Sequence, residues 1–292
     1  MEGNRVVEGA VMRKYLLRPK RSRANTHDAS RPAPSEGSGA SAECSTVGSP
    51  WETLMTKPLQ RDAIYLKRHF DAEIIVLSVR WYITYKLSYR DLAAMMAERG
   101  VVVSHTTIMR WVIRYAPEFE KRWSRFSRSV GCSWRVDETY IAIKGNWHYL
   151  YRAVDKHGRT VDFLLRADRG IAAAQAFFRK ALASHTDHPP LKITLDGHWH
   201  SHRALRLLEH AAWCRVRVRT SRYLNNIVEQ DHRAIKQRCG PMRGFKSFAN
   251  AAVTIAGIEL AHRIHKHQFS FGRGRPRVGA SLRTIWDQAL TP

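Results

Sequence analysis

The sequence predicts a mixed α/β domain, preceded by a small all-α domain and an N-terminal extension without stable structure. Two changes of pattern support this prediction. Apolar residues recur at three- and four-residue steps over about 61–122, as in amphipathic helices, and alternate with period two from residue 133, as in half-buried strands. The predicted boundaries are 1–57 for the extension, 58–125 for the helical domain, 130–268 for the α/β domain and 269–292 for a basic C-terminal tail.

The extension is rich in Ser, Gly, Pro, Ala and Arg, for example over 30–39. Such a stretch cannot bury enough apolar surface to offset the entropy that ordering would cost. We therefore expect residues 1–57 to be disordered, with Met55 as an alternative start of the protein.

Three helices are expected in the helical domain. An apolar stripe marks the first, and Ser88 with Asp91 forms a capping box for the second, over 89–98. Ser104 caps the third, and Pro117 is expected to end it, because the residue before a proline is disfavoured in the α region. The stripe consists of Ile74, Leu77, Ser78, Trp81 and Tyr85.

The second and third helices are joined by a Gly-containing turn, which is typical of a helix-turn-helix that binds DNA. The third would then be the recognition helix, with its polar face toward phosphates and base edges. The alternative is a helical hairpin with a solvated charged face. The candidate DNA contacts are Thr106, Thr107, Arg110 and Arg114.

The α/β domain begins with an antiparallel meander of three strands, in which Lys144-Gly145-Asn146 forms the first turn. Helices and strands then alternate, and this order is that expected of an RNase H-like α/β domain. The expected strands are 133–143, 147–154, 160–166, 191–195 and 213–219, and the expected helices are 171–184, 199–210, 225–237 and 247–266.

The charge of the chain favours a polyanionic partner. The formal net charge is +24, from 49 Lys and Arg against 25 Asp and Glu, and a polyanion gains affinity for such a chain by counterion release.

No apolar run approaches the roughly 18–20 residues that span a bilayer, and the basic N-terminus is not followed by a signal-peptide core. Four cysteines without C-x-x-C spacing indicate ordinary reduced thiols rather than a zinc site or a disulfide framework.

Three carboxylates occupy positions that suit a metal site for phosphodiester chemistry. Asp137 lies in the first predicted strand, Asp196 ends the fourth, and Glu229 opens a helix. Carboxylate oxygens are the ligands that hard divalent cations prefer. Two such cations about 3.5–4 Å apart would activate the attacking oxygen and stabilise the leaving one. Successive side chains of a strand point to opposite faces, so Asp137 and its neighbour Glu138 cannot serve the same site. We favour Asp137, because its face also carries Arg135 and Thr139.

The helix of Glu229 carries cations on the same face as the acid. His232, Arg233 and Lys236 follow at i+3, i+4 and i+7, as a site holding both a metal and a DNA backbone would require. The alternative is a solvated Glu–Arg pair worth only about 0.3–0.5 kcal/mol. Lys144 and Asn226 are further candidate substrate contacts, whereas Asp231 points away on the helix and is not a candidate.

Three histidines after Asp196 raise the alternative of a zinc site. His198, His200 and His202 would align only on a strand, and this segment is predicted to begin a helix, where they diverge. We therefore do not expect zinc there.

Residues 64 to 269 carry a series of motifs that occur in the same order in a known family. Chief among them are Leu87-Ser88-Tyr89-Arg90-Asp91-Leu92, Val136-Asp137-Glu138-Thr139-Tyr140-Ile141, Tyr149-Leu150-Tyr151-Arg152-Ala153-Val154-Asp155, Leu195-Asp196, Tyr223-Leu224-Asn225-Asn226, Glu229-Gln230-Asp231-His232-Arg233 and Gly257-Ile258-Glu259. In these motifs the chain resembles the transposases of bacterial insertion sequences, specifically the insertion sequence six family.

The resemblance implies a DDE transposase with Asp137, Asp196 and Glu229 as catalytic metal ligands for Mg²⁺ or Mn²⁺, with two ions expected. It also implies binding of terminal inverted repeats and target double-stranded DNA, replicative strand transfer through cointegrates, and a homo-oligomer of at least two subunits. The expected location is the bacterial cytoplasm, at the nucleoid and not a membrane. The 32 residues between Asp196 and Glu229 are fewer than the family pattern leads us to expect.

Two alternatives remain open. A related nuclease or resolvase on the same fold would cut DNA without joining it. An inactive or domesticated transposase would act as a DNA-binding regulator through the helix-turn-helix, although such a protein gains nothing from carboxylates in a basic cleft.

Overall fold

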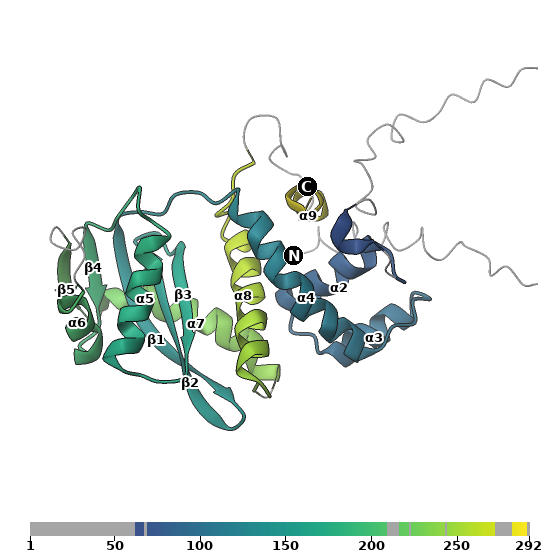
Figure 1. Cartoon of the computed structure of the whole chain (residues 1–292), viewed down its shortest axis with the longest axis horizontal. Helices are drawn as coiled ribbons and strands as arrows, with labels where there is room; N and C mark the ends of the chain where they lie inside the picture. Colours follow the sequence, from purple (N-terminus) through teal and green to yellow (C-terminus); the bar gives the residue numbers. More distant parts are fainter. Residues whose placement is uncertain are drawn as a thin grey trace, which may run out of the picture.

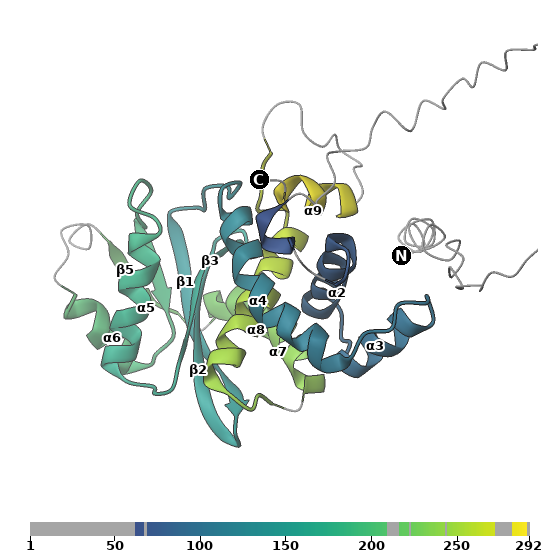
Figure 2. The same cartoon turned by 45° about the vertical axis from the view of Figure 1, so that its right-hand side comes forward.

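The computed structural model of the chain describes residues 62–66, 69–208, 216–221, 223–242, 244–271 and 282–290. The predicted N-terminal extension, Met55 and the basic segment 272–277 lie outside these ranges. A sheet flanked by helices forms one half of the molecule and a group of helices forms the other, with one long helix, α8 (Phe248–His265), between them (Figures 1 and 2). In the described ranges no helix has the length and apolar character to cross a membrane.

The sheet has five strands in the order β3-β2-β1-β4-β5. The first three are antiparallel, whereas β4 runs parallel to β1 and β5 parallel to β4. This arrangement confirms the RNase H-like α/β fold. The strands are β1 (Ser133–Ile143), β2 (Asn146–Asp155), β3 (Thr160–Arg166), β4 (Lys192–Leu195) and β5 (Arg217–Thr220).

The predicted turn between the first two strands has the geometry of a tight hairpin. Ile143 pairs with Asn146, so Lys144 and Gly145 form a two-residue loop, and both have positive φ, at 51° and 80°. Positive φ at both central residues matches the twist of the flanking strands and is tolerated best by glycine. Figure 2 shows that this hairpin projects beyond the rest of the sheet.

Helices cover both faces of the sheet. On one face α5 (Ile171–Ala183) and α6 (Trp199–Arg206) enclose a core with the even-numbered residues of β1, such as Trp134 and Val136. On the other face α7 (Asn226–Cys239) and α8 pack against odd-numbered residues, such as Ile141 and Ile143. This alternation is the period-two pattern from which the strands were predicted.

The last two elements before α7 are shorter than predicted. α6 ends at Arg206 rather than near residue 210, and β5 begins at Arg217 rather than 213. All four residues of β5 are exposed, including Val218, so the alternating pattern of this segment does not correspond to a buried face.

The helical domain contains the three predicted helices, α2 (Ala72–Thr84), α3 (Tyr89–Ala97) and α4 (His105–Ser124). Both hydrogen bonds of the Ser88 and Asp91 capping box are present, and the Ser104 side chain caps α4. The predicted stripe on α2 is only partly right. Tyr85 lies beyond the helix and is exposed, and α2 is buried around most of its circumference because α4 and α8 both pack on it.

The prediction that Pro117 ends the third helix is wrong, since α4 continues to Ser124 with Pro117 inside it. An interior proline removes one backbone hydrogen bond and costs about 3 kcal/mol. Burial beyond the proline offsets this cost, because Phe119 and Trp123 are 0% and 1% exposed. The tertiary packing of this turn therefore overrides the local signal.

The C-terminal segment is more than a basic tail. Residues Leu282–Leu290 form a further helix, α9, whose Trp286 makes edge-to-face contacts with Phe119 and Trp123 at centroid distances of 5.8 and 5.2 Å. Trp286 is 1% exposed and belongs to the core of the helical domain. The sequence prediction missed α9 because a short apolar helix is stable only when a partner surface buries it.

The two halves of the molecule share α8 at a close contact. A Cβ added at Gly257 would lie 2.9 Å from Ile83 Cγ2 and 3.3 Å from Ala116 Cβ. We therefore expect Gly257→Ala to lower the free energy of unfolding by about 1–3 kcal/mol through overpacking. Chemical denaturation would measure this, with Gly240→Ala as the control, since Gly240 has helical backbone angles and no atom within 4 Å of an added Cβ. Equal stability of both variants would contradict the expectation.

Candidate active site

Asp137 lies in the middle of β1 on the face that α7 covers. Its side chain is 16% exposed, and residues 139 and 141 on the same face are buried. The neighbouring Glu138 points to the opposite face, where its carboxylate accepts a hydrogen bond from Arg169 Nε at 2.7 Å. Alternation along the strand thus separates the two acids, as the sequence predicted.

Asp196 comes directly after β4, beside Asp137. The parallel pairing of β1 and β4 ends with Val136 opposite Leu195, so Asp137 and Asp196 follow the same register pair. Parallel strands end at one edge of the sheet, which brings these two residues together. The Asp196 Oδ1 atom accepts a hydrogen bond from the His198 backbone N–H at 3.1 Å, which fixes the loop into α6.

Glu229 lies in the first turn of α7 and is exposed. Two hydrogen bonds tie the start of this helix to β1. Arg135 Nε donates to the Leu224 carbonyl at 3.0 Å, and Asn225 Nδ2 donates to the Val136 carbonyl at 3.4 Å. Asn225 is 2% exposed, so it positions the helix.

The electrostatics of Asp137 indicate that the three acids are near one another. Burial, together with the negative charges of Glu138, Asp196 and Glu229, raises the pKa of Asp137 to about 7. Across the described ranges, no three His, Cys, Asp or Glu side chains already lie close enough to hold a metal ion. Asp196 and Glu229 are therefore close enough to Asp137 to raise its pKa, but the three carboxylates are farther apart than the ligands of one bound metal ion.

The raised pKa has a consequence for stability. A carboxylate whose pKa is higher in the folded state stabilises the fold when protonated, and this contribution is lost as the pH rises from about 4 through about 7. In EDTA at pH 8 we expect Asp137→Asn to be more stable than the natural chain by roughly 3 kcal/mol, after discounting for residual exposure. Urea unfolding at pH 8, 6 and 4 would measure the difference, which should shrink toward zero at pH 4. A stability difference that did not change with pH would contradict the raised pKa of Asp137.

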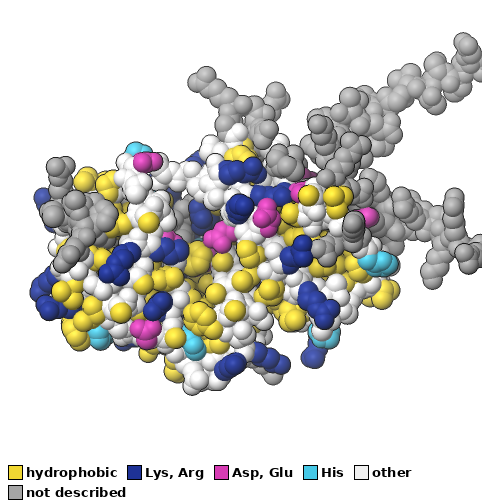
Figure 3. All heavy atoms as spheres, viewed as in Figure 1, with side chains coloured by type: hydrophobic (Ala, Val, Ile, Leu, Met, Phe, Trp, Pro, Cys, Tyr) yellow, Lys and Arg dark blue, Asp and Glu magenta, His cyan; other side chains and the backbone are white. Residues whose placement is uncertain are grey.

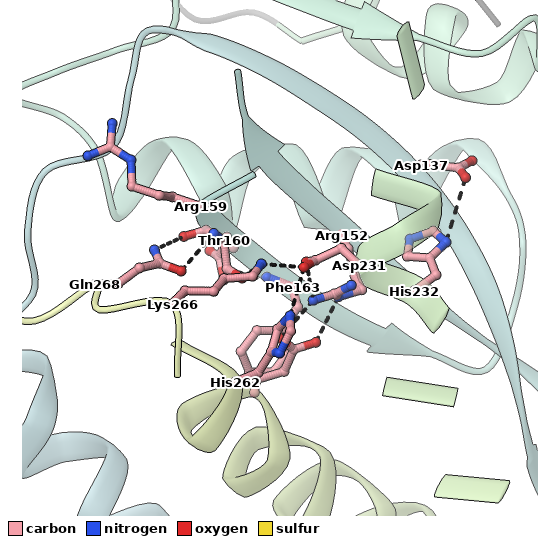
Figure 4. Close-up of polar contacts among 12 residues, drawn as sticks. Asp137, Arg152, Arg159, Thr160, Phe163, Asp231, His232, His262, Lys266 and Gln268 are labelled. Carbon is pink, nitrogen blue, oxygen red and sulfur yellow. Dashed lines mark hydrogen bonds and ion pairs between the residues drawn. The ribbon is translucent and has the colours of Figure 1, made fainter. Parts of the chain in front are cut away.

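His232 is not the exposed cation that the sequence suggested. It is 6% exposed, and its Nδ1 atom lies 3.7 Å from Asp137 Oδ2 (Figure 4). Burial and the charge of Arg152 lower the pKa of His232 to about 3, so the ring is neutral near pH 7. The ring of His232 therefore lies beside the Asp137 carboxylate in the interior rather than on the surface of α7.

A buried network of charged residues behind His232 holds α7 and α8 on the sheet. Arg152 on β2 is fully buried and donates to both oxygens of Glu259, from Nε at 2.7 Å and from Nη2 at 2.9 Å. Its Nη2 atom also lies 2.6 Å from Asp231, which interacts in addition with His262 and Lys266 (Figure 4).

Asp231, which the sequence analysis set aside, is thus the centre of this network. Burial alone would raise its pKa, but the hydrogen bond with His262 and the charges of Arg152 and Lys266 hold the pKa well below its usual range. The signal in the sequence was a charged residue within an apolar run, as Arg152 is within Leu150–Val154 and Glu259 is within α8. Such residues are buried only when they are paired.

The other predicted DNA contacts lie on two surfaces. Four of these residues belong to the α/β domain, and all four are exposed. Asn226, Arg233 and Lys236 lie on α7, and Lys144 lies in the turn between β1 and β2. On α4 the polar face is exposed as predicted, except that Thr107 is half-buried and its hydroxyl lies 2.8 Å from the Ser104 hydroxyl. The exposed residues of that face are Thr106, Arg110 and Arg114.

The expectation that the three histidines after Asp196 diverge is wrong for two of them. The rings of His198 and His200 stack with centroids 4.9 Å apart, and their Nδ1 atoms lie 3.1 Å apart. The His202 Nε2 atom instead lies 2.9 Å from the Asp196 carbonyl oxygen.

Comparison with known proteins defines the class of this fold and site. A family model described as a DDE domain matches residues 131–268, the segment that holds all three acids. Together with the RNase H-like sheet, this makes the chain a polynucleotidyl transferase of the DDE type.

The family follows from full-length relatives. The transposase for insertion sequence-like element IS431mec of Staphylococcus aureus is 38% identical over 200 residues, which cover 68% of this chain and 87% of that protein. The transposase for insertion sequence element IS257 in transposon Tn4003, also from Staphylococcus aureus, matches with the same identity and coverage. The chain belongs to the insertion sequence six family of DDE transposases.

Among solved structures, the catalytic core domain of HTLV-2 integrase in complex with magnesium is similar. The two are 18% identical with a TM-score of 0.34, over 44% of this chain and 83% of that one.

Proposed function

We propose that this transposase binds the terminal inverted repeats of its insertion sequence and joins their 3′ ends to target DNA by replicative strand transfer, giving cointegrates. The observation that supports the proposal is the arrangement of the acids. Asp137 and Asp196 follow the same register pair of β1 and β4, and the charges of Asp196 and Glu229 both contribute to the raised pKa of Asp137. A site built from repelling carboxylates is costly by itself and becomes favourable when cations neutralise it.

The donor set fits Mg²⁺ or Mn²⁺. Asp137, Asp196 and Glu229 offer hard carboxylate oxygens without a thiolate, and two ions would match three acids. When bound, such ions lower the pKa of water and stabilise the attacking and leaving oxygens. The three carboxylates repel one another when no ion is bound, and bound cations would remove this repulsion.

The chain's own residues supply DNA contacts and alignment. Asn226, Arg233 and Lys236 on α7 are exposed and suited to hold phosphates in line with the acids. Lys144, in the exposed turn of the β1–β2 hairpin, would contact the DNA farther from them. His232 packs against Asp137 and limits the positions that this carboxylate can take. No nucleophilic side chain is required, because a 3′-hydroxyl of DNA can attack directly.

Sequence recognition is assigned to the helical domain. We infer that α3 and α4 form the helix-turn-helix, with Thr106, Thr107, Arg110 and Arg114 toward the terminal repeat. Two ends must be held together for transposition, so the working unit is at least a dimer, acting at the bacterial nucleoid.

Strand transfer of a pre-cleaved terminal repeat into plasmid DNA tests the proposal. Joined product is expected in Mg²⁺ and not in EDTA. Sequence-specific binding without any joining would favour the regulator, and cutting without joining would favour a nuclease. Either outcome would overturn the proposed function.

A further inference from the structure

Two large aromatic side chains are exposed side by side on the β1–β2 hairpin. Tyr140 is 56% and Trp147 is 62% exposed, and their rings meet edge to face with centroids 5.5 Å apart. Single exposed hydrophobic residues need no explanation, whereas a contiguous exposed patch usually marks a binding surface.

The topology of the sheet leaves this pair uncovered. Tyr140 pairs with Tyr149, and Ala142 pairs with Trp147, so the two aromatic residues lie on one face of the hairpin. β4 pairs with β1 only as far as Val136, and on the same edge Phe245 bridges to β1 at Ile143. Among the described residues, the edge of β1 around Tyr140 therefore has no neighbouring strand. The hairpin projects past the neighbouring helices (Figures 1 and 2).

One lysine contacts the aromatic pair, and two more lie at the end of the hairpin. The Nζ atom of Lys236 lies 4.8 Å from the centre of the Tyr140 ring. Lys144 at the turn is exposed, and its backbone N–H donates to the Phe245 carbonyl at 2.7 Å, which brings the exposed Lys246 to the same end of the hairpin.

One acid, Glu138, lies on the same face of β1 as Tyr140, and its carboxylate is paired with Arg169. The rest of the surface carries no acid, since neither 139–154 nor 232–258 contains an Asp or Glu. At the lower end of the molecule, Lys and Arg side chains lie beside hydrophobic ones (Figure 3). Positive charge with exposed aromatic rings is the combination by which proteins bind single-stranded nucleic acid.

The surface begins close to the acid triad. Tyr140 is three residues beyond Asp137 on β1, or about 10 Å along a strand. Lys236 is two helical turns beyond Glu229 on α7, or again about 10 Å. By alternation Tyr140 lies on the sheet face opposite Asp137, and Lys236 reaches around the free edge of β1 to join the two.

We propose that Tyr140 and Trp147, flanked by Lys236, form a stacking platform for unpaired bases of the DNA strand next to the reacting phosphodiester. The inference rests on the proposed function and specifies its substrate as DNA that is locally unpaired at the reacting end. Aromatic faces accept any base, so the platform would hold the strand without reading its sequence.

Binding of two DNA substrates would test the platform. One is a fully paired terminal-repeat duplex, and the other carries a few unpaired nucleotides at the reacting end with 2-aminopurine among them. Trp147→Ala and Tyr140→Ala should weaken binding of the unpaired substrate about 5- to 100-fold, the range of one lost stacking contact, and leave the paired duplex unchanged. They should also restore the 2-aminopurine fluorescence that stacking quenches in the natural chain, whereas Trp147→Phe should retain most of the quenching.

Leu191→Ala is the matched control, since Leu191 is 61% exposed but lies directly before β4, away from the hairpin. Equal weakening on both substrates, or unchanged quenching in Trp147→Ala, would overturn the platform. A variant whose molar mass in solution changes, with base stacking intact, would identify a contact between copies of the chain and would also overturn it.

Strand transfer by the same variants separates the two proposals. If the natural chain joins DNA normally and the aromatic variants bind and join as well as it does, only the platform fails. If the natural chain joins nothing in Mg²⁺, the proposed function fails, and the quenching measurement still decides the platform.

Discussion

The Asp196→Asn variant is expected to lose strand transfer by about 10³-fold or more, equivalent to about 4 kcal/mol of transition-state stabilisation. The amide has nearly the same shape as the carboxylate but cannot supply a charged oxygen to a divalent cation. Because the oxygen of an amide can accept the hydrogen bond that the His198 backbone N–H donates to Asp196, the loop into α6 should keep its structure. Joined product, measured in Mg²⁺ over a time course, would give the rate.

DNA binding should survive this substitution, since it removes a negative charge from a basic surface. Asp168→Asn is the control. Asp168 belongs to the same domain, its side chain is 56% exposed, and its ion pair with Arg166 is long, at 3.7 Å. We expect Asp168→Asn to join DNA at the natural rate. Retained activity in Asp196→Asn, or equal losses in both variants, would refute the role of Asp196.

The Arg152→Met variant is expected to lose about 3–5 kcal/mol of unfolding free energy, because it leaves buried carboxylates without a compensating charge. Glu259 is fully buried, and Arg152 donates two hydrogen bonds to it. Asp231 keeps its contacts with His262 and Lys266, so most of the loss should come from Glu259. Urea unfolding monitored by circular dichroism would measure the change.

A second variant isolates the cause of this loss. Arg152→Met combined with Glu259→Leu removes both buried charges and should recover much of the stability. Arg159→Met is the matched control, because Arg159 is 33% exposed although its partner Asp155 is buried. Asp155 also accepts hydrogen bonds from three backbone N–H groups, so the loss should be well below that of Arg152→Met. If the double variant were less stable than Arg152→Met, the unpaired charge would not be the cause.

The candidate site could be predicted from the sequence as a set of residue types at particular elements. Asp137 on a strand, Asp196 at a strand end and Glu229 at a helix start were each placed by local patterns. The role of His232 could not be predicted, since exposure on a helix depends on what packs against it. Helical spacing placed His232 on one face with Arg233 and Lys236, but contact with β1 buries the histidine alone.

The sequence by itself determined the order of helices and strands, the antiparallel meander and the candidate acids. These features depend on periodicities of two and 3.6 residues and on capping and turn residues, which act over a few positions of the chain. The two-residue turn at Lys144 and Gly145 and the capping box at Ser88 are of this kind.

Only the tertiary structure decided where local sequence patterns were overridden and which distant residues are in contact. It continued α4 through Pro117, added α9 to the helical core, paired Arg152 with Glu259 across 107 residues of sequence and left Tyr140 exposed at a free strand edge. Each of these outcomes depends on burial against a distant segment. The free energy of such packing exceeds that of local propensity, and no window of a few residues contains it.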